Sequence, residues 1–319
     1  MVRHSLIIYL CYQAKGQISV LMSRESIKEY ALLHPLNEKE KRNLKLVEEV
    51  KSYSTDSLEY LPTQNFTQVY HQNNSPSLWV ITASEPFALK AYEWEFPLIR
   101  KVSYKGFFRK DLAEKEMNRL CALNYDVDMR PVSAWSTLGW FNDPLLSSML
   151  RKSKGGICNL LFHELFHATY YAPSSVDLNE NMASFIAHKA TLQFLKNDTL
   201  ALREYLENEK DNELINDFMT RQNANLKKYY GEIEGKSDRL LLKLRMIKHI
   251  ADSLDVLPVK NKKLLELHRE QVMEQKNAYF IDFEQYDSKQ DSLDEAFNKF
   301  YKGDLKKMVQ DLKRKSNYY

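Results

Sequence analysis

The chain has 319 residues, which is long enough for one large domain or two small ones with a sizeable buried core. Its 46 Lys and Arg residues against 43 Asp and Glu give a formal net charge of only +3. Nucleic-acid-binding proteins concentrate basic residues on one surface, so this near balance argues against a nucleic-acid partner. The lysines near the C-terminus (KGDLKKMVQDLKRK) are interleaved with acidic residues, which is typical of a solvated helix face.

Membrane-spanning and disulfide-rich classes are also disfavoured. No segment reaches the roughly 18–20 apolar residues that a membrane-spanning helix needs. The N-terminal run SLIIYL is too short for the core of a signal peptide and fits either a first strand or a turn of helix, although a leader could have been removed before it. Cys11, Cys121 and Cys158 form no metal-binding pattern, so we expect buried free thiols. The chain as given is predicted to be soluble.

The first half of the chain mixes predicted helices and strands. Residues 38–52 (EKEKRNLKLVEEVKS) predict a charged amphipathic helix. Within 78–136, the segments LWVITASEP, EWEFPLIRKVSYKG and YDVDMRPVSAWS are rich in β-branched and aromatic residues and are punctuated by Pro and Gly, which indicates strands. Between the last two, the apolar spacing in 108–124 (FRKDLAEKEMNRLCALN) predicts a helix.

After Pro144 the chain is predicted to be almost wholly helical. Apolar residues recur at three- and four-residue spacing in the segments 155–172, 178–206, 211–230, 236–255, 262–280 and 290–315. The predicted fold class is therefore α+β and predominantly α, with a small mixed sheet in the N-terminal half (1–143) and a helical body (144–319). No repeat or linker interrupts the sequence, so we expect residues 1–319 to form a single domain.

The segment LLFHELFH (160–167) contains two histidines four residues apart. On an α-helix, His163 and His167 lie one above the other on the same face, so both imidazoles can reach one ion at about 2.0–2.1 Å. Glu164 lies beside that face, where the glutamate of an HExxH motif acts as general base toward a metal-bound water. The remaining neighbours are apolar, so the helix should be buried. The alternative is a core helix whose histidines hydrogen-bond to backbone carbonyls.

The next segment supplies a candidate third ligand, because catalytic zinc sites usually keep three protein ligands and one open position. Glu180 opens the following helix after the turn APSSVDLN. Ala183 and Ala187 share its face and allow the two helices to pack closely. Taken alone, Glu180 could be an acid favoured by the helix N-terminus. Combined with HExxH, it predicts one Zn²⁺ per chain, although cobalt or manganese could replace zinc in vitro.

Other residues are candidates for supporting roles. A tyrosine could stabilise the oxyanion, and the candidates are Tyr104, Tyr229 and Tyr230. His188 is expected to lie in the core or behind the metal ligands.

The segment before the HExxH helix offers further candidates. Asp143 followed by Pro144 indicates a helix start, with Asp143 as the N-cap. Alternatively Asp143, Glu93 or Glu95 could bind the amino group of a peptide. An aromatic cluster either lines a substrate pocket or fills the core, and its members are Trp135, Trp140 and Phe141.

These motifs resemble those of the gluzincins, the thermolysin-like zinc peptidases with HExxH and a downstream NExx glutamate. WSTLGWFNDPLLSSML (135–150) and YQAKGQ (12–17) narrow the resemblance to a bacterial family described as putative aminopeptidases. FPLIRKVSYKGFF, NYDVDMRPVSAWSTLGWF and, more loosely, NAYFIDFEQYDS also fit that family. The resemblance implies a zincin-like fold and a zinc peptidase acting on peptides. Its ligands would be His163, His167 and Glu180, and its base Glu164.

The sequence departs from the pattern of this family at several positions. The family usually has another aromatic residue, often Tyr, where Trp135 stands, and Asp where Asn142 stands. The chain also lacks a GxMEN-type glutamate that would grip a free amine, so aminopeptidase and endopeptidase activity both stay open. Family members commonly begin with a membrane or lipoprotein anchor. A missing N-terminal anchor, and with it a periplasmic or membrane-anchored location, therefore stays open as well.

We expect a zinc metallopeptidase acting on peptide N-termini or short peptides. The predicted strand at 126–135 would pair with extended substrate by strand addition. One alternative is a non-catalytic helical interaction protein in which a structural zinc has its fourth position covered by protein. Another is a zinc hydrolase acting on something other than peptides. The oligomeric state and the natural substrate do not follow from the sequence.

Overall fold

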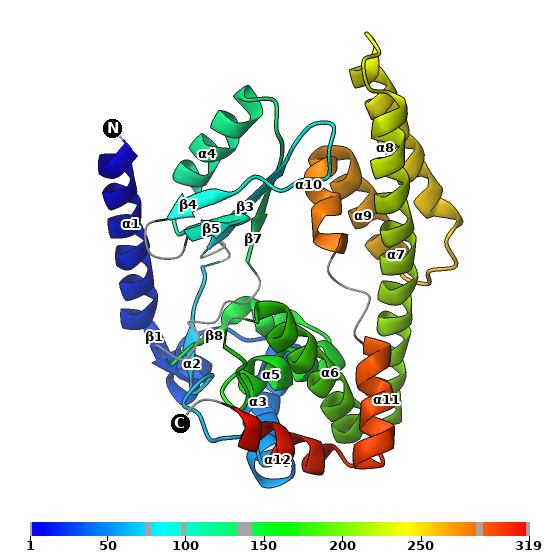
Figure 1. Cartoon of the computed structure of the whole chain (residues 1–319). Helices are drawn as coiled ribbons and strands as arrows, with labels where there is room; N and C mark the ends of the chain where they lie inside the picture. Colours follow the sequence, from blue (N-terminus) through cyan, green and yellow to red (C-terminus); the bar gives the residue numbers. More distant parts are fainter. Residues whose placement is uncertain are drawn as a thin grey trace. The chain divides into compact units, whose positions relative to one another are not determined.

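The computed structural model describes residues 2–73, 78–96, 100–132, 142–173, 175–284 and 290–316 (Figure 1). The chain divides into two compact units that interleave along the sequence. Unit 1 comprises Met1–Gln17, Pro76–Val132 and Glu207–Tyr286, and unit 2 comprises Ile18–Ser75, Ser133–Leu206 and Asp287–Tyr319. This division does not coincide with the halves that meet at residue 143, and the single domain stays a prediction.

Unit 1 contains an antiparallel sheet with the strand order β6–β3–β7. The central strand β3 (Trp79–Ser84) pairs with β6 (Tyr104–Phe107) and β7 (Asp126–Pro131). A separate pair is formed by β4 (Trp94–Phe96) and β5 (Arg100–Val102). Helix α4 (Lys110–Ala122) packs on β3 and β7 through buried Ala113 and Leu120. The predicted strands are confirmed within 79–96, 100–107 and 126–131, whereas 97–99 and 133–136 lie outside the described residues, and the helix predicted at 108–124 is confirmed as α4.

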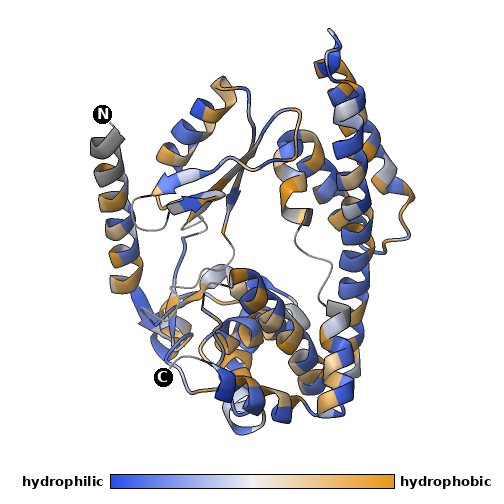
Figure 2. Ribbon diagram, viewed as in Figure 1, coloured by the Kyte–Doolittle hydropathy of each residue, from blue (hydrophilic) through white to orange (hydrophobic). Residues whose placement is uncertain are grey.

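The helical part of unit 1 has its own core. It contains α8 (Arg239–Ser253), η2 (Leu254–Val256), α9 (Lys262–Gln275), α10 (Asn277–Phe280) and η3 (Ile281–Glu284), together with the C-terminal part of α7. Their apolar faces meet in one cluster that includes the fully buried Ile215, Ile247 and Val272. Figure 2 shows the corresponding pattern along α7, where hydrophobic residues recur among hydrophilic ones.

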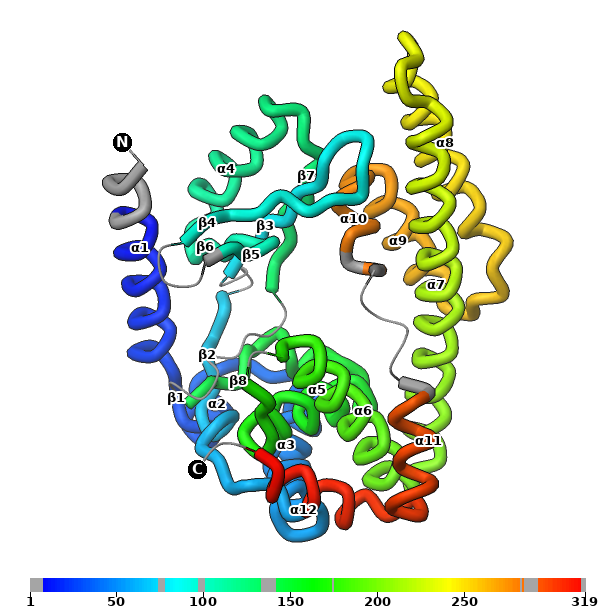
Figure 3. The backbone as a smooth tube through the Cα atoms, in the orientation of Figure 1, coloured from blue at the N-terminus to red at the C-terminus, as the bar shows by residue number. Residues whose placement is uncertain are grey.

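Unit 2 combines a mixed sheet with a larger helical core. Strand β2 (Gln68–Tyr70) pairs antiparallel with β1 (Arg24–Ser26) and parallel with β8 (Leu145–Leu146). The helices are α2 (Ile27–Leu33), α3 (Glu38–Asp56), η1 (Ser147–Arg151), α5 (Lys154–Phe166), α6 (Val176–Leu195), α11 (Gln290–Tyr301) and α12 (Leu305–Lys315). Helix α5 packs against both α3 and α6 (Figure 3). Its Phe162 and Phe166 are fully buried.

Two long helices continue across the sequence boundary between the units. They are α1 (Val2–Met22) and α7 (Thr199–Glu232). SLIIYL lies within α1, so of the two predicted alternatives the helix is the one observed. No helix within the described ranges is both long and apolar enough to cross a membrane.

Most expected helices are present, but several boundaries were wrong. The helix predicted at 38–52 is α3, which begins with a capping box between Asn37 and Glu40. The segment 178–206 is divided, because α6 ends at Leu195 and α7 starts at Thr199 and continues through 211–230 without a break. The segment 290–315 is likewise divided, because Gly303 adopts φ +76° between α11 and α12.

Three further expectations are corrected. Asp143 and Pro144 do not start a helix, because the extended strand β8 follows them and pairs with β2. In the described part of the chain the strands form three small sheets, of which only the one in unit 2 is mixed. All three cysteines are free, but only Cys158 is buried, whereas Cys11 and Cys121 are exposed.

One buried carboxylate in unit 1 generates a stability prediction. Glu116 accepts hydrogen bonds from Trp94 Nε1 (2.7 Å) and Arg119 Nη2 (2.9 Å), and Lys105 lies 3.6 Å away. Burial raises the pKa of Glu116, but these hydrogen bonds and charges outweigh it and lower the pKa to about 2. Because this folded pKa lies below the unfolded value of 4.5, the stabilisation is present above pH 4.5 and is lost as the pH falls toward 2.

We therefore expect Glu116→Gln to lower the free energy of unfolding at pH 7 by about 2 kcal/mol, with the deficit shrinking below pH 4.5. Urea titrations between pH 7 and pH 2.5 measure this difference. The control is Glu114→Gln on the same helix, whose exposed ion pair with Lys110 should contribute little. A pH-independent deficit for Glu116→Gln would contradict the charge-based explanation.

Candidate metal centre

Helix α5 places the two histidines of HELFH on one face. The helix starts at Ser153, whose Oγ accepts a hydrogen bond from the Gly156 amide (3.2 Å). Gly155 allows α7 to approach closely, because a Cβ at that position would lie 2.6 Å from Tyr205. The helix ends at Phe166, but His167 keeps right-handed helical angles (φ −58°, ψ −26°). The four-residue spacing therefore still aligns its imidazole with that of His163.

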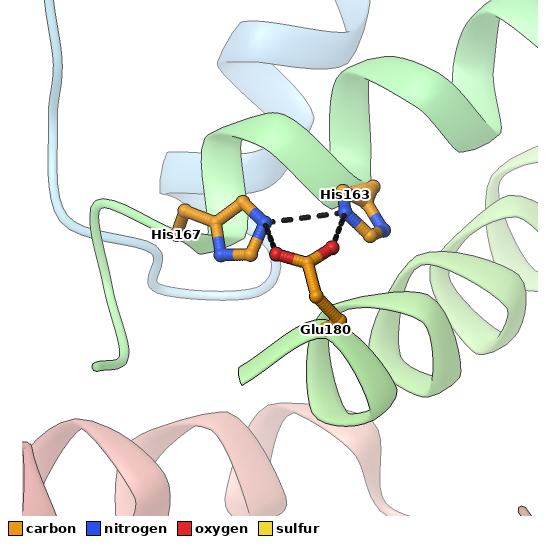
Figure 4. A group of neighbouring side chains, drawn as sticks. All are labelled: His163, His167 and Glu180. Carbon is orange, nitrogen blue, oxygen red and sulfur yellow. Dashed lines mark hydrogen bonds and ion pairs between the residues drawn. The ribbon is translucent and has the colours of Figure 1, made fainter. Parts of the chain in front are cut away.

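Glu180 in the first turns of α6 completes a triad with these histidines (Figure 4). The two Nε2 atoms of His163 and His167 are 3.2 Å apart. The Glu180 carboxylate lies between them, 3.2 Å from His163 Nε2 and 3.4 Å from His167 Nε2. Within the described ranges, this is the one group of three or more His, Cys, Asp or Glu side chains arranged to hold a metal ion.

These distances fit a tetrahedral zinc ion. Zinc–nitrogen and zinc–oxygen bonds of about 2.0–2.2 Å in tetrahedral geometry separate neighbouring ligand atoms by roughly 3.3 Å. The three observed separations of 3.2, 3.2 and 3.4 Å agree with that value. Two imidazoles and one carboxylate also form a common catalytic zinc ligand set. The residues present therefore fit the ion that the sequence predicts.

The turn between α5 and α6 is held by an asparagine that the sequence analysis did not assign. Asn179 Oδ1 accepts a hydrogen bond from the Ala172 amide (2.7 Å), and its Nδ2 donates to the Ala172 carbonyl (3.0 Å). The side chain is 6% exposed. Ala183 and Ala187 are fully buried, and α6 packs against α5, as their predicted role in close packing requires. Together these contacts fix the position of Glu180.

The charges of the triad suit a cation. Burial, and then the neighbouring His163, lower the pKa of His167 to about 4 against the opposing effect of Glu180. His167 is therefore neutral at pH 7, which is the form that binds metals. The pKa of Glu180 is lowered, first by its hydrogen bond with His163, so its carboxylate is ionised. The triad then offers a neutral nitrogen from His167 and an anionic oxygen from Glu180.

Glu164 lies in a different electrostatic environment from Glu180. Burial, together with the charges of Glu180 and Asp143 and against the effect of His163, raises the pKa of Glu164 to about 7. A carboxyl with a pKa near 7 is suited to exchange protons at neutral pH. A divalent cation bound by the triad would lower this pKa, because it favours the carboxylate form.

Asp143 is buried, with 3% of its surface exposed, and its charge acts on Glu164. Its amide donates to Asn65 Oδ1 (3.0 Å), and its carbonyl accepts from the Phe66 amide (2.8 Å). These long-range bonds hold the segment extended, which explains why the predicted N-cap does not form. The other sequence-based alternative, an acid near the metal site, agrees better with this position.

Two further contacts surround the ligands. Ser184 on α6 lies 3.4 Å from His163 Nδ1, so a proton on Nδ1 would leave Nε2 free to bind a metal. His188 is not part of the triad. Its Nδ1 lies 3.0 Å from Tyr205 Oη, which also accepts a hydrogen bond from Asn159. This agrees with the expectation that His188 lies in the core or behind the ligands.

Several residues predicted to bind the oxyanion or the amino group of the substrate belong to unit 1. Tyr230 donates to Asn277 and is buried, whereas Tyr104 is 58% exposed. Tyr229 lies 3.5 Å from the Leu242 carbonyl. Glu93 and Glu95 both pair with Lys101. Their roles in oxyanion or amine binding stay predictions.

The remaining candidates lie around residue 142. Trp135, Trp140 and Phe141 are outside the described residues. Asn142 is exposed, and its carbonyl accepts a hydrogen bond from Arg24 (2.8 Å). Strand β7 covers the first part of the predicted strand at 126–135, and its pairing with substrate stays a prediction.

Comparison with known proteins gives one match. The model of the family described as "Putative aminopeptidase" matches residues 8–317, which is nearly the whole chain. Searches of curated proteins and of solved structures found no match.

The turn that precedes Glu180 generates a testable prediction. Asn179→Ala removes two buried hydrogen bonds and leaves both polar groups of Ala172 without this partner. We expect the free energy of unfolding to fall by about 1–3 kcal/mol in urea titrations. Asn197→Ala, at an exposed position just after α6, should change it by less than about 0.5 kcal/mol. Equal effects of the two substitutions would show that the Asn179 bonds do not stabilise the turn.

Proposed function

The chain belongs to the family of putative aminopeptidases, and on that premise we propose that it is a zinc-dependent peptidase of the gluzincin type with a zincin-like fold. The observation that carries the proposal is the triad of His163, His167 and Glu180, whose ligand atoms are spaced as a tetrahedral zinc ion requires. Glu164, on the same helix, is the proposed general base. The substrate is a peptide, and family membership supports cleavage at its N-terminus.

In the proposed zinc site, the metal and the protein side chains have different roles. When bound, zinc supplies a Lewis acid for the scissile carbonyl and lowers the pKa of a coordinated water toward 7. Histidines bind metals through neutral nitrogens, so Glu180 alone would offset the charge of the ion. The site then keeps a net positive charge, which favours the anionic oxygen that develops when a peptide carbonyl is attacked.

Glu164 moves the proton in this proposal. Its carboxylate accepts a proton from the attacking water and then donates it to the amine of the leaving group. Burial keeps its affinity for a proton higher than that of an ordinary glutamate, as its raised pKa indicates. Asp143 adds a second negative charge to this environment. A base with an intermediate pKa can perform both transfers near pH 7.

The exposure of Glu180 favours a catalytic zinc site over a structural one. The side chain of Glu180 is 54% exposed, whereas those of His163 and His167 are 19% and 14% exposed. Structural zinc sites are closed by four protein ligands, but among the residues that the structure describes only three such side chains converge here. A fourth position on the exposed side is therefore proposed for water or substrate.

The substitution Glu164→Gln tests the proposed base. It keeps the size of the side chain but removes its ability to accept a proton from water. We expect kcat for a set of aminoacyl-p-nitroanilides and short peptides to fall by at least about 100-fold, while zinc content stays near that of the wild type. Activity is measured by product release and zinc by elemental analysis on the same samples.

The matched control is Glu48→Gln, an exposed glutamate on α3, which should retain wild-type kcat. Substantial hydrolysis by zinc-loaded Glu164→Gln would exclude Glu164 as the base. A wild type that binds zinc but hydrolyses none of these substrates would favour a non-peptide substrate or the interaction-protein alternative.

A further inference from the structure

The first turn of helix α6 carries an exposed carboxylate close to the metal triad. Asp177 stands three residues before Glu180, so the two side chains are neighbours on one face of the helix, with Cβ atoms roughly 5–6 Å apart. Figure 4 shows that α6 begins beside the triad. Both side chains are exposed, so they share the solvent-facing side of the site.

The carboxylate of Asp177 has no partner among the residues that the structure describes. Its backbone carbonyl accepts a hydrogen bond from Asn181 Nδ2 (2.7 Å), but its side chain forms no ion pair or hydrogen bond within those residues. The helix dipole favours an acid in a first turn, and this stabilising role is the alternative to a role in binding.

A peptide with a free N-terminus would bring a positive charge into the proposed site. Its α-amino group is mostly protonated at pH 7, and the nitrogen lies only two bonds from the carbonyl carbon of the first residue. Next to a divalent cation, this charge is repelled unless a carboxylate offsets it. Glu180 is used by the metal and Glu164 by the proton of the attacking water, so cleavage at a free N-terminus calls for another carboxylate.

The acids that the sequence suggested for this role are less suitable than Asp177. Asp143 is only 3% exposed, so an ammonium group in solution has little access to it. Glu93 and Glu95 both pair with Lys101. Asp177 is both exposed and unpaired, and it lies one helical turn from a proposed metal ligand.

We propose that Asp177 binds the ammonium group of a peptide substrate and thereby selects free N-termini. The inference rests on the proposed peptidase function, and it favours aminopeptidase over endopeptidase activity, which the sequence motifs leave open. The N-terminal residue of the substrate would then lie over the first turn of α6. The Asp177 side chain is assigned a role in substrate binding and none in the chemical step.

Two substrates that differ only in the charge of the amine test the proposal. We expect the zinc-loaded wild type to hydrolyse L-leucine p-nitroanilide with a kcat/KM at least about tenfold above that for its N-acetyl derivative. Asp177→Asn should lose most of this preference through a higher KM for the free amine, whereas Asp177→Glu should keep part of it. The control Asp56→Asn, at an exposed aspartate that ends α3, should keep the wild-type preference.

A binding measurement separates recognition of the amine from the chemical step. In zinc-loaded Glu164→Gln, calorimetry at pH 7 should show that adding Asp177→Asn weakens binding of L-leucyl-L-leucinamide by about tenfold and leaves binding of its N-acetyl derivative unchanged. A role confined to stabilising the helix would leave both affinities unchanged.

The proposal is overturned if Asp177→Asn keeps the wild-type preference and affinity. It is also overturned if the wild type hydrolyses the acetylated substrate as efficiently as the free amine. In both cases the observed hydrolysis would still support the proposed peptidase. If the zinc-loaded wild type hydrolyses neither substrate and binds neither peptide, the proposed function fails and the role of Asp177 fails with it.

Discussion

The close packing of α5 against α6 is the constraint on which the candidate metal centre depends. It brings two imidazole nitrogens and a carboxylate within 3.2–3.4 Å of one another, although the carboxylate comes from a different helix. Fully buried alanines on α6 permit this approach, and Asn179 fixes the turn that reverses the chain. Such close polar groups require either shared protons or a cation. In the proposed site, a zinc ion bound by all three groups would satisfy them together.

The same burial separates the roles of the two glutamates. Glu180 is half-exposed and ionised, whereas burial raises the pKa of Glu164. The first can therefore serve as a metal ligand and the second as a proton carrier, as the proposed peptidase requires.

Local sequence patterns predicted the parts of the site that depend on helical geometry. The spacing of His163 and His167 and the position of Glu180 follow from the period of the α-helix, and the structure brings these residues together. The roles of Asn179 and Ser184 could not be predicted, because their partners become neighbours only after the two helices pack. Asp143 was misassigned for the same reason. An Asp-Pro pair is compatible with a helix start, but pairing of β8 with β2 and bonds to Asn65 and Phe66 favour an extended chain.

The central claim is that three side chains hold one zinc ion, and zinc content per chain tests it most directly. Elemental analysis should be made on the wild type and on Glu180→Ala after incubation with zinc and removal of the excess. The account predicts close to one zinc per wild-type chain, and loss or marked weakening of binding in folded Glu180→Ala, because one of three ligands is absent. Absence of zinc from the wild type, or equal zinc in both proteins, would contradict it.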